Sequence, residues 1–481
     1  MVISYAGVAE NLPETACSVL RDSSRSMDMT GKELLLQALK GETTSRPAWL
    51  PFVGCHGGFL IGKTAAEYLQ SADLLVAGLK KARELYKPDG LPVIFDLQVE
   101  AEILGCRLRW ADEVPPAVLG HPLAEGGNIA DLPMLDETRG RFPVIVQALE
   151  RLKKDIGADT ALYGLICGPF TLALHLLGSD IFLDMYDDQD RVLAVIDYCA
   201  GICIKSADIY LDHGADVIAV VDPMTSQISP DHFVQFVTSA MNTVYDHIRA
   251  RGGLSSIFVC GDVTRNLEVM VKTTADCICV DEQIDMARLR ELCRAEGKSF
   301  GGNIKLTSVL LLGDEADAKM EALDIMEKSK TKGFILAPGC DLPYAVPVKN
   351  IQAVADMVHE EYKREVAKTL TAKIADTFDD IILPDYKSAN TVLIDVITLD
   401  STSCAPCQYM MEAVQKAAAE ANTLCYIHEH KIKMRRGIGM MVKLGVKNLP
   451  AICINGEVKF ASIIPDQRTL VAAIEEAAGE S

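Results

Sequence analysis

The sequence contains no apolar run long enough to cross a lipid bilayer. Apolar stretches such as ADVIAVV and SVLLLG end far short of the roughly 18 residues that a membrane-spanning helix needs. The N-terminal segment MVISYAGVAENLPETACSVL lacks the basic start and the continuous apolar core of a secretory signal. We therefore expect a cytoplasmic protein with no membrane partner.

Positive charge is also scarce. The chain has 67 acidic and 47 basic residues among 481, and its formal net charge is −20. Such a surface repels phosphate backbones, so nucleic acid is excluded as a partner. From Thr391 onward the acidic and basic residues nearly balance, and the acidic excess therefore belongs to the first part of the chain. The excess by itself is typical of a solvated, soluble surface.

A disulfide framework is not expected, although the chain has 15 cysteines. The number is odd, the chain is long, and no secretory signal is visible, so most cysteines are expected to be free thiols in a reducing cell. Most of them fit the role of small apolar side chains in a core. Cys260, Cys340, Cys404 and Cys407 lie in contexts where chemistry is expected instead.

The first part of the chain alternates short apolar runs with longer amphipathic segments, which is typical of parallel βα units. Eight runs are predicted to be strands: 48–54, 91–96, 160–167, 216–222, 256–260, 277–281, 299–304 and 333–338. That number predicts an α/β fold with a (β/α)8 TIM-type barrel. An open doubly wound sheet is the alternative, but no glycine-rich dinucleotide loop follows the first run.

The C-terminal part has a different pattern, with the order β-α-β-α-β-β-α from Thr391 onward. A C-x-x-C motif stands at the start of its first helix, and together they predict a small thioredoxin-like α/β domain. The predicted organisation has four parts: an extension (1–28), the barrel (29–365), a linker (366–390) and the thioredoxin-like domain (391–481).

The C-x-x-C motif predicts a redox-active dithiol. A helix N-terminus favours the thiolate, so Cys404 is the expected nucleophile and Cys407 the resolving thiol. Half of a zinc site and an inert relic are the alternatives. No second cysteine pair stands nearby, and Leu449–Pro450 occurs where thioredoxin-like folds place a cis-proline, which favours the redox role.

Thiols and carboxylates recur where the predicted barrel strands end, and in such barrels these ends carry the chemistry. The residues concerned are Cys55, His56, Asp96, Cys167, Asp222, Cys260, Asp262, Asp281, Glu282, Asn303 and Cys340. Thiolates and carboxylates in a ring are donors that suit zinc. Helix capping is the ordinary alternative for each Asp or Asn. Cys260 and Cys340 stand beside glycine turns that expose the side chain, so they are the strongest candidates.

Six segments carry a family resemblance: RPAWLPFVGCHGGFLIGK, FDLQVEAEILGC, ICGPFTL, VDPMTSQISPDHF, VCGDVT and LAPGCDLPYAVPVKNIQAV. They resemble the uroporphyrinogen decarboxylase superfamily over residues 29–365. Within it, the likeness is greater to the cobalamin-dependent methyltransferase branch, which includes the methylcobalamin:coenzyme M methyltransferases. The resemblance implies a TIM barrel independently of the strand count.

One departure from the family argues against uroporphyrinogen decarboxylation. The decarboxylases grip the substrate's carboxylates with an arginine-rich segment after the first strand, where this chain has PFVGCHGG and no arginine between Arg46 and Arg83. Asp96 does fall where the decarboxylases keep an essential aspartate. One aspartate without the arginines is a poor site for a polyanionic tetrapyrrole.

The resemblance to the methyltransferases implies a zinc site made by a His-x-Cys pair and a later cysteine. Cys260 and Cys340 match the two cysteines, whereas Phe258 holds the position of the histidine. Three other rim residues are candidates for the third ligand: His56, Asp262 and Glu282. Without one of them, two thiolates make a poor zinc site.

The implied activity is methyl transfer between a small molecule and the cobalt of a corrinoid carried by a separate partner protein, with zinc as Lewis acid. The small molecule is a methyl donor, or a thiol or tetrahydrofolate-type acceptor. No cobalamin-binding D-x-H-x-x-G segment occurs in this chain. In this hypothesis Asp96, Glu102 and Asp222 shape the pocket or move protons.

The fusion of the two domains leaves three further hypotheses. The dithiol keeps Cys260 and Cys340 reduced, or it delivers electrons to an associated redox centre. Alternatively, the barrel is a non-catalytic scaffold and the thioredoxin-like domain provides a thiol–disulfide redox activity. A decarboxylase of another small acid would need a cationic clamp, and the predicted rim shows none.

Overall fold

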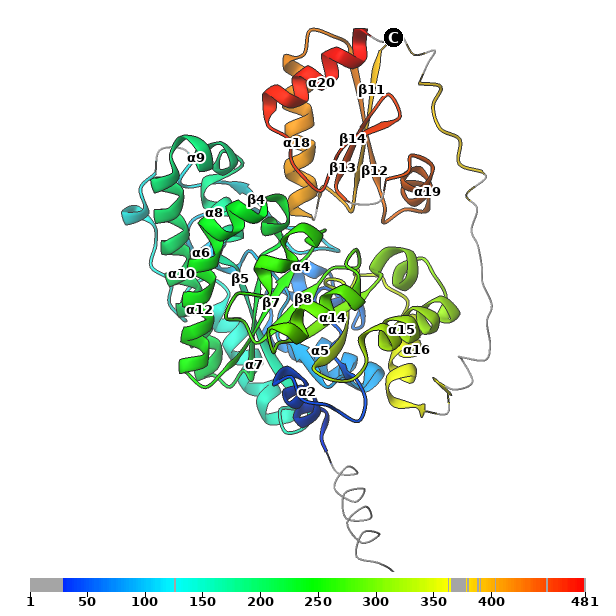
Figure 1. The fold of residues 1–481 in the computed structure, drawn as a ribbon. Coiled ribbons are helices and arrows are strands. Elements are labelled where there is room, and N and C mark those ends of the chain that lie inside the picture. Colours follow the sequence, from blue (N-terminus) through cyan, green and yellow to red (C-terminus); the bar gives the residue numbers. More distant parts are fainter. Residues whose placement is uncertain are drawn as a thin grey trace, which may run out of the picture.

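The structure is a computed structural model in which a large α/β barrel carries a small α/β domain (Figure 1). It describes residues 29–124, 127–361, 363–364, 378, 380–386, 389, 391–402, 404–446 and 449–479. The predicted N-terminal extension lies outside the described residues, as does most of the predicted linker. In the part of the chain that is described, no helix is long and apolar enough to cross a membrane.

All eight predicted barrel strands are present and parallel. They are β1 (Ala48–Trp49), β2 (Gly90–Pro92), β5 (Ala161–Cys167), β6 (Val217–Val221), β7 (Leu254–Val259), β8 (Cys277–Val280), β9 (Ser299–Ile304) and β10 (Phe334–Pro338). Their order is β1-β10-β9-β8-β7-β6-β5-β2. The Asp89 N–H, just before β2, donates to the Trp49 carbonyl of β1 at 2.9 Å, so the barrel is nearly closed.

Helices surround the barrel. The α-helices are α2 (Gly31–Leu39), α3 (His56–Phe59), α4 (Ala65–Tyr68), α5 (Ala72–Tyr86), α6 (Val99–Ile103), α7 (Phe142–Asp155), α8 (Pro169–Leu177), α9 (Ile181–Asp187), α10 (Gln189–Asp212), α11 (Pro230–His232), α12 (Thr238–Ala250), α13 (Leu267–Met270), α14 (Met286–Ala295), α15 (Glu315–Ser329) and α16 (Val348–His359). Shorter 3-10 or π turns are η1 (Ile129–Asp131), η2 (Pro223–Gln227), η3 (Phe233–Val237), η4 (Thr264–Asn266) and η5 (Leu306–Leu311). A hairpin of β3 (Arg107–Arg109) and β4 (Ala117–Gly120) was not expected from the sequence.

Strand side chains alternate between two buried layers, as the pleat of a strand requires. In β5, Ala161, Tyr163 and Leu165 belong to the cluster inside the barrel, while Leu162 and Ile166 belong to the cluster between strands and helices. A ring cluster of Phe52, Phe95 and Phe258 also fills the interior, with Phe52 and Phe258 ring centroids 4.7 Å apart.

The small domain has the predicted element order. Its elements are β11 (Val392–Thr398), α18 (Ala405–Glu420), β12 (Cys425–Lys431), α19 (Arg435–Lys443), β13 (Ala451–Ile454), β14 (Glu457–Ala461) and α20 (Gln467–Gly479). The sheet order is β12-β11-β13-β14, and the Leu449–Pro450 peptide bond is cis. Ile381 and Tyr386, in the predicted linker, pack against this domain.

The small domain lies over the carboxyl end of the barrel (Figure 1). Helix α18 contacts η2 of the barrel, and Tyr409 of α18 is 4% exposed within the barrel's outer core cluster. The Leu449 N–H donates to Oε1 of Gln283, which follows β8, at 3.3 Å. Apolar packing and the hydrogen bond between Leu449 and Gln283 therefore hold the small domain, with the start of α18, above the strand ends.

Candidate functional site

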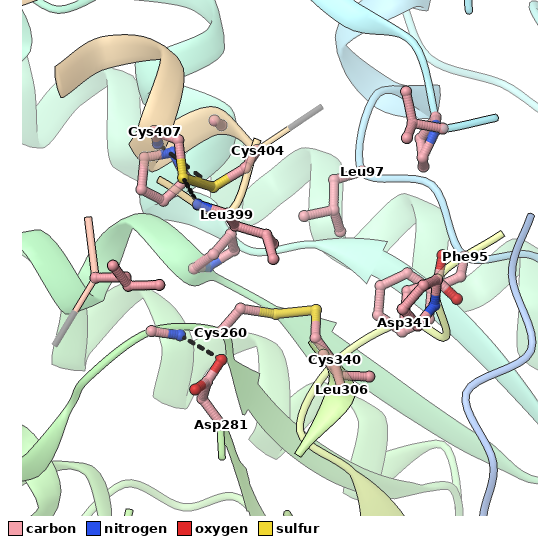
Figure 2. A pocket seen from close by; sticks show the side chains of 18 of the residues that line it. Phe95, Leu97, Cys260, Asp281, Leu306, Cys340, Asp341, Leu399, Cys404 and Cys407 are labelled. Atoms are coloured by element: carbon pink, nitrogen blue, oxygen red, sulfur yellow. Dashed lines mark hydrogen bonds between the residues drawn. A yellow bond between two sulfur atoms is a disulfide. The ribbon is translucent and has the colours of Figure 1, made fainter. Parts of the chain in front are cut away.

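A cavity of about 230 Å³ lies between the carboxyl end of the barrel and the small domain, and we call it the rim pocket. Its barrel wall comes from the segments that follow all eight barrel strands. Its other wall comes from the start of α18 and the loops beside it, including Leu399, Lys433 and Pro450. Two cysteine pairs face this space from opposite walls (Figure 2).

The barrel contributes Cys260 and Cys340, which we call the barrel pair. They follow β7 and β10, are separated by 80 residues, and form a disulfide with Cα atoms 6.0 Å apart. Strands β8 and β9 lie between β7 and β10 in the sheet, so the disulfide spans the ends of two other strands. These are the two cysteines that the sequence predicted as metal ligands. That prediction was of free thiolates for a metal, whereas the structure joins them.

The small domain contributes Cys404 and Cys407, which we call the helix pair. They also form a disulfide, at the N-terminus of α18. The Cys404 sulfur accepts a hydrogen bond from the Cys407 N–H at 3.4 Å, and the Cys407 sulfur accepts one from the Leu399 N–H at 3.3 Å. Cys407 is 1% exposed, whereas Cys404 is half-buried. Cys404 is therefore the sulfur that another group can reach.

Two adjacent carboxyls after β8 line the rim pocket. Asp281 accepts the Gly261 N–H at 3.0 Å, directly beside Cys260, and Glu282 accepts the Leu306 N–H at 2.6 Å. Burial raises the pKa of both carboxyls, and their mutual repulsion raises that of Glu282 further. Glu282 is thus placed to hold or release a proton near neutral pH.

Asp96 and Glu102 are joined through an arginine that the sequence analysis missed. Arg141 donates to Asp96 Oδ2 at 2.5 Å and to Glu102 Oε2 at 2.8 Å, and its guanidinium lies 4.9 Å from the Trp110 ring centroid. Asp96 lines the rim pocket, and Glu102 lies behind it through Arg141. Arg141 precedes α7 and is 45 residues from Asp96, so no local pattern pointed to it.

Asp222 holds the start of α8. Its carboxylate accepts the N–H groups of Phe170 and Thr171, and also the Thr171 hydroxyl at 2.5 Å. Asp222 is fully buried, and burial raises its pKa to about 6. Its contacts are those of the capping alternative, and through them it positions Thr171 and His175, which line the rim pocket.

Of the three candidates for a third zinc ligand, Glu282 lines the rim pocket, whereas His56 and Asp262 are engaged elsewhere. His56 is fully buried, with Nδ1 2.8 Å from the Tyr344 carbonyl and Nε2 2.7 Å from the Tyr86 hydroxyl. Burial lowers the pKa of His56 to about 4, so the ring is neutral. Asp262 accepts the N–H and hydroxyl of Thr264 in a local turn.

Phe258, in the expected histidine position, is 1% exposed in the phenylalanine ring cluster and offers no donor. Within the described ranges, no group of three or more His, Cys, Asp or Glu side chains is placed to hold a metal ion. Since the two thiols are also joined to each other, this arrangement of residues does not fit zinc.

Further pocket residues were also missed. His175 is buried with Nδ1 lacking a hydrogen-bond partner, and burial lowers its pKa to about 3. Asp341, next to Cys340, accepts the Gly54 N–H at 2.8 Å, and burial raises its pKa. Lys433 reaches the pocket from the small domain, and its Nζ donates to Oδ2 of Asp400 at 3.2 Å. The run KIKMRR was the one sequence signal that could have pointed to Lys433.

Comparisons with known proteins agree with this two-part structure. The uroporphyrinogen decarboxylase family matches residues 30–361, and a thioredoxin domain family matches residues 392–475. The barrel therefore matches the first family and the small domain matches the second.

Curated relatives include two methyltransferases and a decarboxylase. Methylcobamide:CoM methyltransferase MtbA of Methanosarcina acetivorans is 26% identical over 274 residues, which cover 56% of this chain and 78% of the relative. MtaA of Methanosarcina barkeri is 26% identical over 342 residues, covering 70% and 99%. A uroporphyrinogen decarboxylase of Prochlorococcus marinus is 22% identical over 332 residues, covering 66% and 93%.

Among solved structures, a methyltransferase from Methanosarcina mazei superposes with a TM-score of 0.64 at 24% identity. The match covers 70% of this chain and 100% of that structure. At this identity the likeness establishes the barrel fold.

Proposed function

We propose a function from one premise: the chain belongs to the uroporphyrinogen decarboxylase family, whose model matches residues 30–361. In this proposal the barrel of the chain transfers a methyl group between a small thiol and the cobalt of a corrinoid that a separate protein carries. The observation that carries this proposal is the similarity to the methylcobamide:CoM methyltransferases, which extends over 99% of MtaA. The pocket at the carboxyl end of the barrel, lined by acids and thiols, supports it.

In the direction toward the thiol, the sulfur–carbon bond forms as the cobalt–carbon bond breaks, and cobalt keeps the electron pair. The thiol must lose its proton to become the nucleophile. We propose that Glu282 accepts this proton. Its raised pKa suits a base that works near neutral pH, and its side chain lines the rim pocket. Asp96 is held by Arg141, which also binds Glu102, and it shapes the part of the barrel wall that follows β2.

Zinc assistance remains a prediction of the family resemblance, and no step of the proposed transfer depends on it. The sulfurs of the barrel pair become donors only after their disulfide is reduced. Metal analysis of protein reduced and purified without oxygen tests the prediction. About one zinc per chain, lost in Cys260→Ser, is the expected result for a zinc enzyme.

The small domain restricts access to the rim pocket. A cavity of about 230 Å³ is smaller than the ~300 Å³ at which pockets for small organic ligands begin, and a corrinoid is larger than most such ligands. We therefore propose that this arrangement is a resting form, and that the small domain moves aside when the corrinoid protein docks. We also propose a cytoplasmic setting, because the other described cysteines are free thiols.

The experiment is methyl transfer from methylcobalamin, free or on a corrinoid protein, to small thiols and to tetrahydrofolate under anaerobic conditions. Loss of the methyl–cobalt absorbance measures it. Glu282→Gln is expected to lower the rate on the order of 100-fold and to remove its rise with pH, because the proton acceptor is lost. Glu268→Gln is the matched control, since Glu268 is an exposed partner of Arg288.

If the fully reduced chain transfers no methyl group to any acceptor, the methyltransferase proposal fails. The alternative function, a thiol–disulfide redox protein with a non-catalytic barrel, then gains support from the two disulfides that face the rim pocket.

A further inference from the structure

The two disulfides of this chain line one cavity. The barrel pair lies on the barrel wall of the rim pocket and the helix pair on the small-domain wall, with side chains such as Leu97 and Leu306 around them (Figure 2). Cys260, Cys340 and Cys404 are all half-buried, so each retains some exposure. Two disulfides from different domains therefore share the lining of one cavity.

A chain of contacts links the two pairs. Leu449 precedes the cis-proline beside the helix pair, and its N–H donates to the side chain of Gln283 at 3.3 Å. The Gln283 N–H donates to Asp281 at 3.2 Å, and Asp281 accepts the N–H of Gly261, the residue after Cys260. The polar contact between the domains therefore ends beside the barrel pair.

Apolar packing holds the helix pair in the same place. Tyr409, two residues past Cys407, is buried in the barrel's outer core cluster, and Ala405 also packs against that cluster. The His121 and Tyr409 ring centroids are 6.5 Å apart. These contacts involve the first turns of α18, so they orient the end of the helix that carries the sulfurs.

We propose that the small domain is a reductase for its own barrel and passes two electrons from the helix pair to the barrel disulfide. The Cys404 thiolate attacks one barrel sulfur; the Cys260–Cys340 bond breaks, a mixed disulfide forms, and the other barrel sulfur leaves as a thiolate. Cys407 loses its proton to solvent and attacks Cys404. The mixed bond then breaks, the Cys404–Cys407 disulfide forms, and the second barrel thiolate is released.

The exchange conserves electrons: one disulfide is reduced while one dithiol is oxidised. An external small dithiol reduces the helix pair again and so sets the direction of the cycle. The helix N-terminus stabilises the attacking Cys404 thiolate. Because both pairs belong to one chain, the effective concentration of one for the other is on the order of millimolar.

Reduction changes the rim pocket itself. The barrel disulfide ties the loop after β7 to the loop after β10 across the ends of β8 and β9, where Asp281 and Glu282 lie. Its cleavage frees two thiols beside these carboxyls and removes the tie. The barrel therefore has an oxidised and a reduced state, and the small domain controls which one is present.

Trapping of the mixed disulfide tests the proposal. In the full chain carrying Cys407→Ser, Cys404 has no resolving partner, so its attack on the barrel disulfide stops at the mixed stage. Non-reducing peptide mapping after alkylation is expected to find a peptide joining Cys404 to Cys260 or Cys340, with one barrel thiol alkylated. Cys404 alkylated beside an intact barrel disulfide, in variant protein with the circular dichroism of the parent, would overturn the proposal.

Kinetics separate exchange within one chain from exchange between chains. Chain that holds both disulfides receives dithiothreitol at one fixed concentration, in excess over the protein but far below millimolar, and the appearance of barrel thiols is followed by timed alkylation at several protein concentrations. The expected first-order rate constant does not depend on protein concentration, and Cys404→Ser lowers it on the order of 100-fold. Cys425→Ser is the matched control, because Cys425 is a half-buried free thiol of the same domain.

A first-order rate constant that rises with protein concentration, or one unchanged by Cys404→Ser, contradicts a reductase acting within its own chain. The readout is the state of thiols alone. Failure of methyl transfer therefore leaves this proposal standing, and failure of exchange leaves the methyltransferase proposal standing.

Discussion

The barrel pair and the helix pair are both cysteine pairs of one pocket, yet they come together in different ways. The helix pair is three residues apart, on the first turn of one helix. The barrel pair is 80 residues apart and meets only because the barrel closes in the order β10-β9-β8-β7. The comparison shows that one site depends on local geometry and the other on the whole barrel.

The largest expected effect concerns the stability of the barrel. Arg141→Ala leaves the buried Asp96 carboxylate without its partner, and we expect the barrel to lose about 3–5 kcal/mol of unfolding free energy. Urea unfolding followed by separate probes for each domain measures it, and the small-domain transition stays in place. Arg151→Ala, which breaks an exposed pair with Asp73, is the control and has little effect.

The next largest effect is a dependence of the barrel's stability on pH. Burial raises the folded pKa of Asp222 to about 6, above its ordinary value of 3.8, so the folded state holds this proton longer than the unfolded state. The contribution of Asp222 to stability is therefore full below about pH 4 and decreases by up to ~3 kcal/mol as pH rises through 6. In Asp222→Asn this decrease disappears from the barrel transition, as unfolding at several pH values can show.

The small domain is expected to respond to pH in the opposite sense. Burial opposes ionisation of Asp400, but Lys431, Thr402 and Lys433 outweigh it and lower its pKa. The stabilisation by Asp400 is present above its unfolded pKa and is lost as pH falls through its lowered folded pKa. If the unfolding free energies of the two domains changed equally with pH, this expected difference between the domains would be contradicted.

Oxidation of the unfolded chain separates the two pairs directly. In urea, loop closure favours a pair three residues apart over one 80 residues apart on the order of 100-fold. We therefore expect the helix pair to re-form its disulfide in urea while the barrel pair does not. Peptide mapping after oxidation measures both, and equal yields would show that the barrel pair does not need the barrel.

The smallest expected effect concerns thiol reactivity in the reduced chain. The N-terminus of α18 favours the Cys404 thiolate, whereas burial raises the pKa of Cys425. Near pH 7, Cys404 should therefore react with iodoacetamide on the order of 10-fold faster than Cys425. Equal rates would show that the N-terminus of α18 does not activate Cys404.

Much of the fold could be predicted, because its signals are local. The eight barrel strands and the β-α-β-α-β-β-α order of the small domain follow from apolar runs and helical periodicity within a few residues. The β3–β4 hairpin was missed because its strands are only 3 and 4 residues long, and β3 is one leucine between two exposed arginines, so the pattern is too short to indicate a strand.

The candidate site could be predicted only in part. Cys260, Cys340, Asp96, Asp281 and Glu282 stand at strand ends, and parallel strands bring such ends to one face. No local pattern shows that His56 uses both ring nitrogens within the protein, or that Asp222 caps α8.

The two domains, the eight strands and the helix pair could be derived from the sequence, since each of these depends on residues that are neighbours along the chain. Three relations became visible only in the folded chain: the barrel pair is joined, Arg141 holds Asp96, and the helix pair faces the barrel pair across one pocket. Those relations are contacts between residues tens to hundreds of positions apart. They exist only once the barrel has closed and the small domain has packed against its rim.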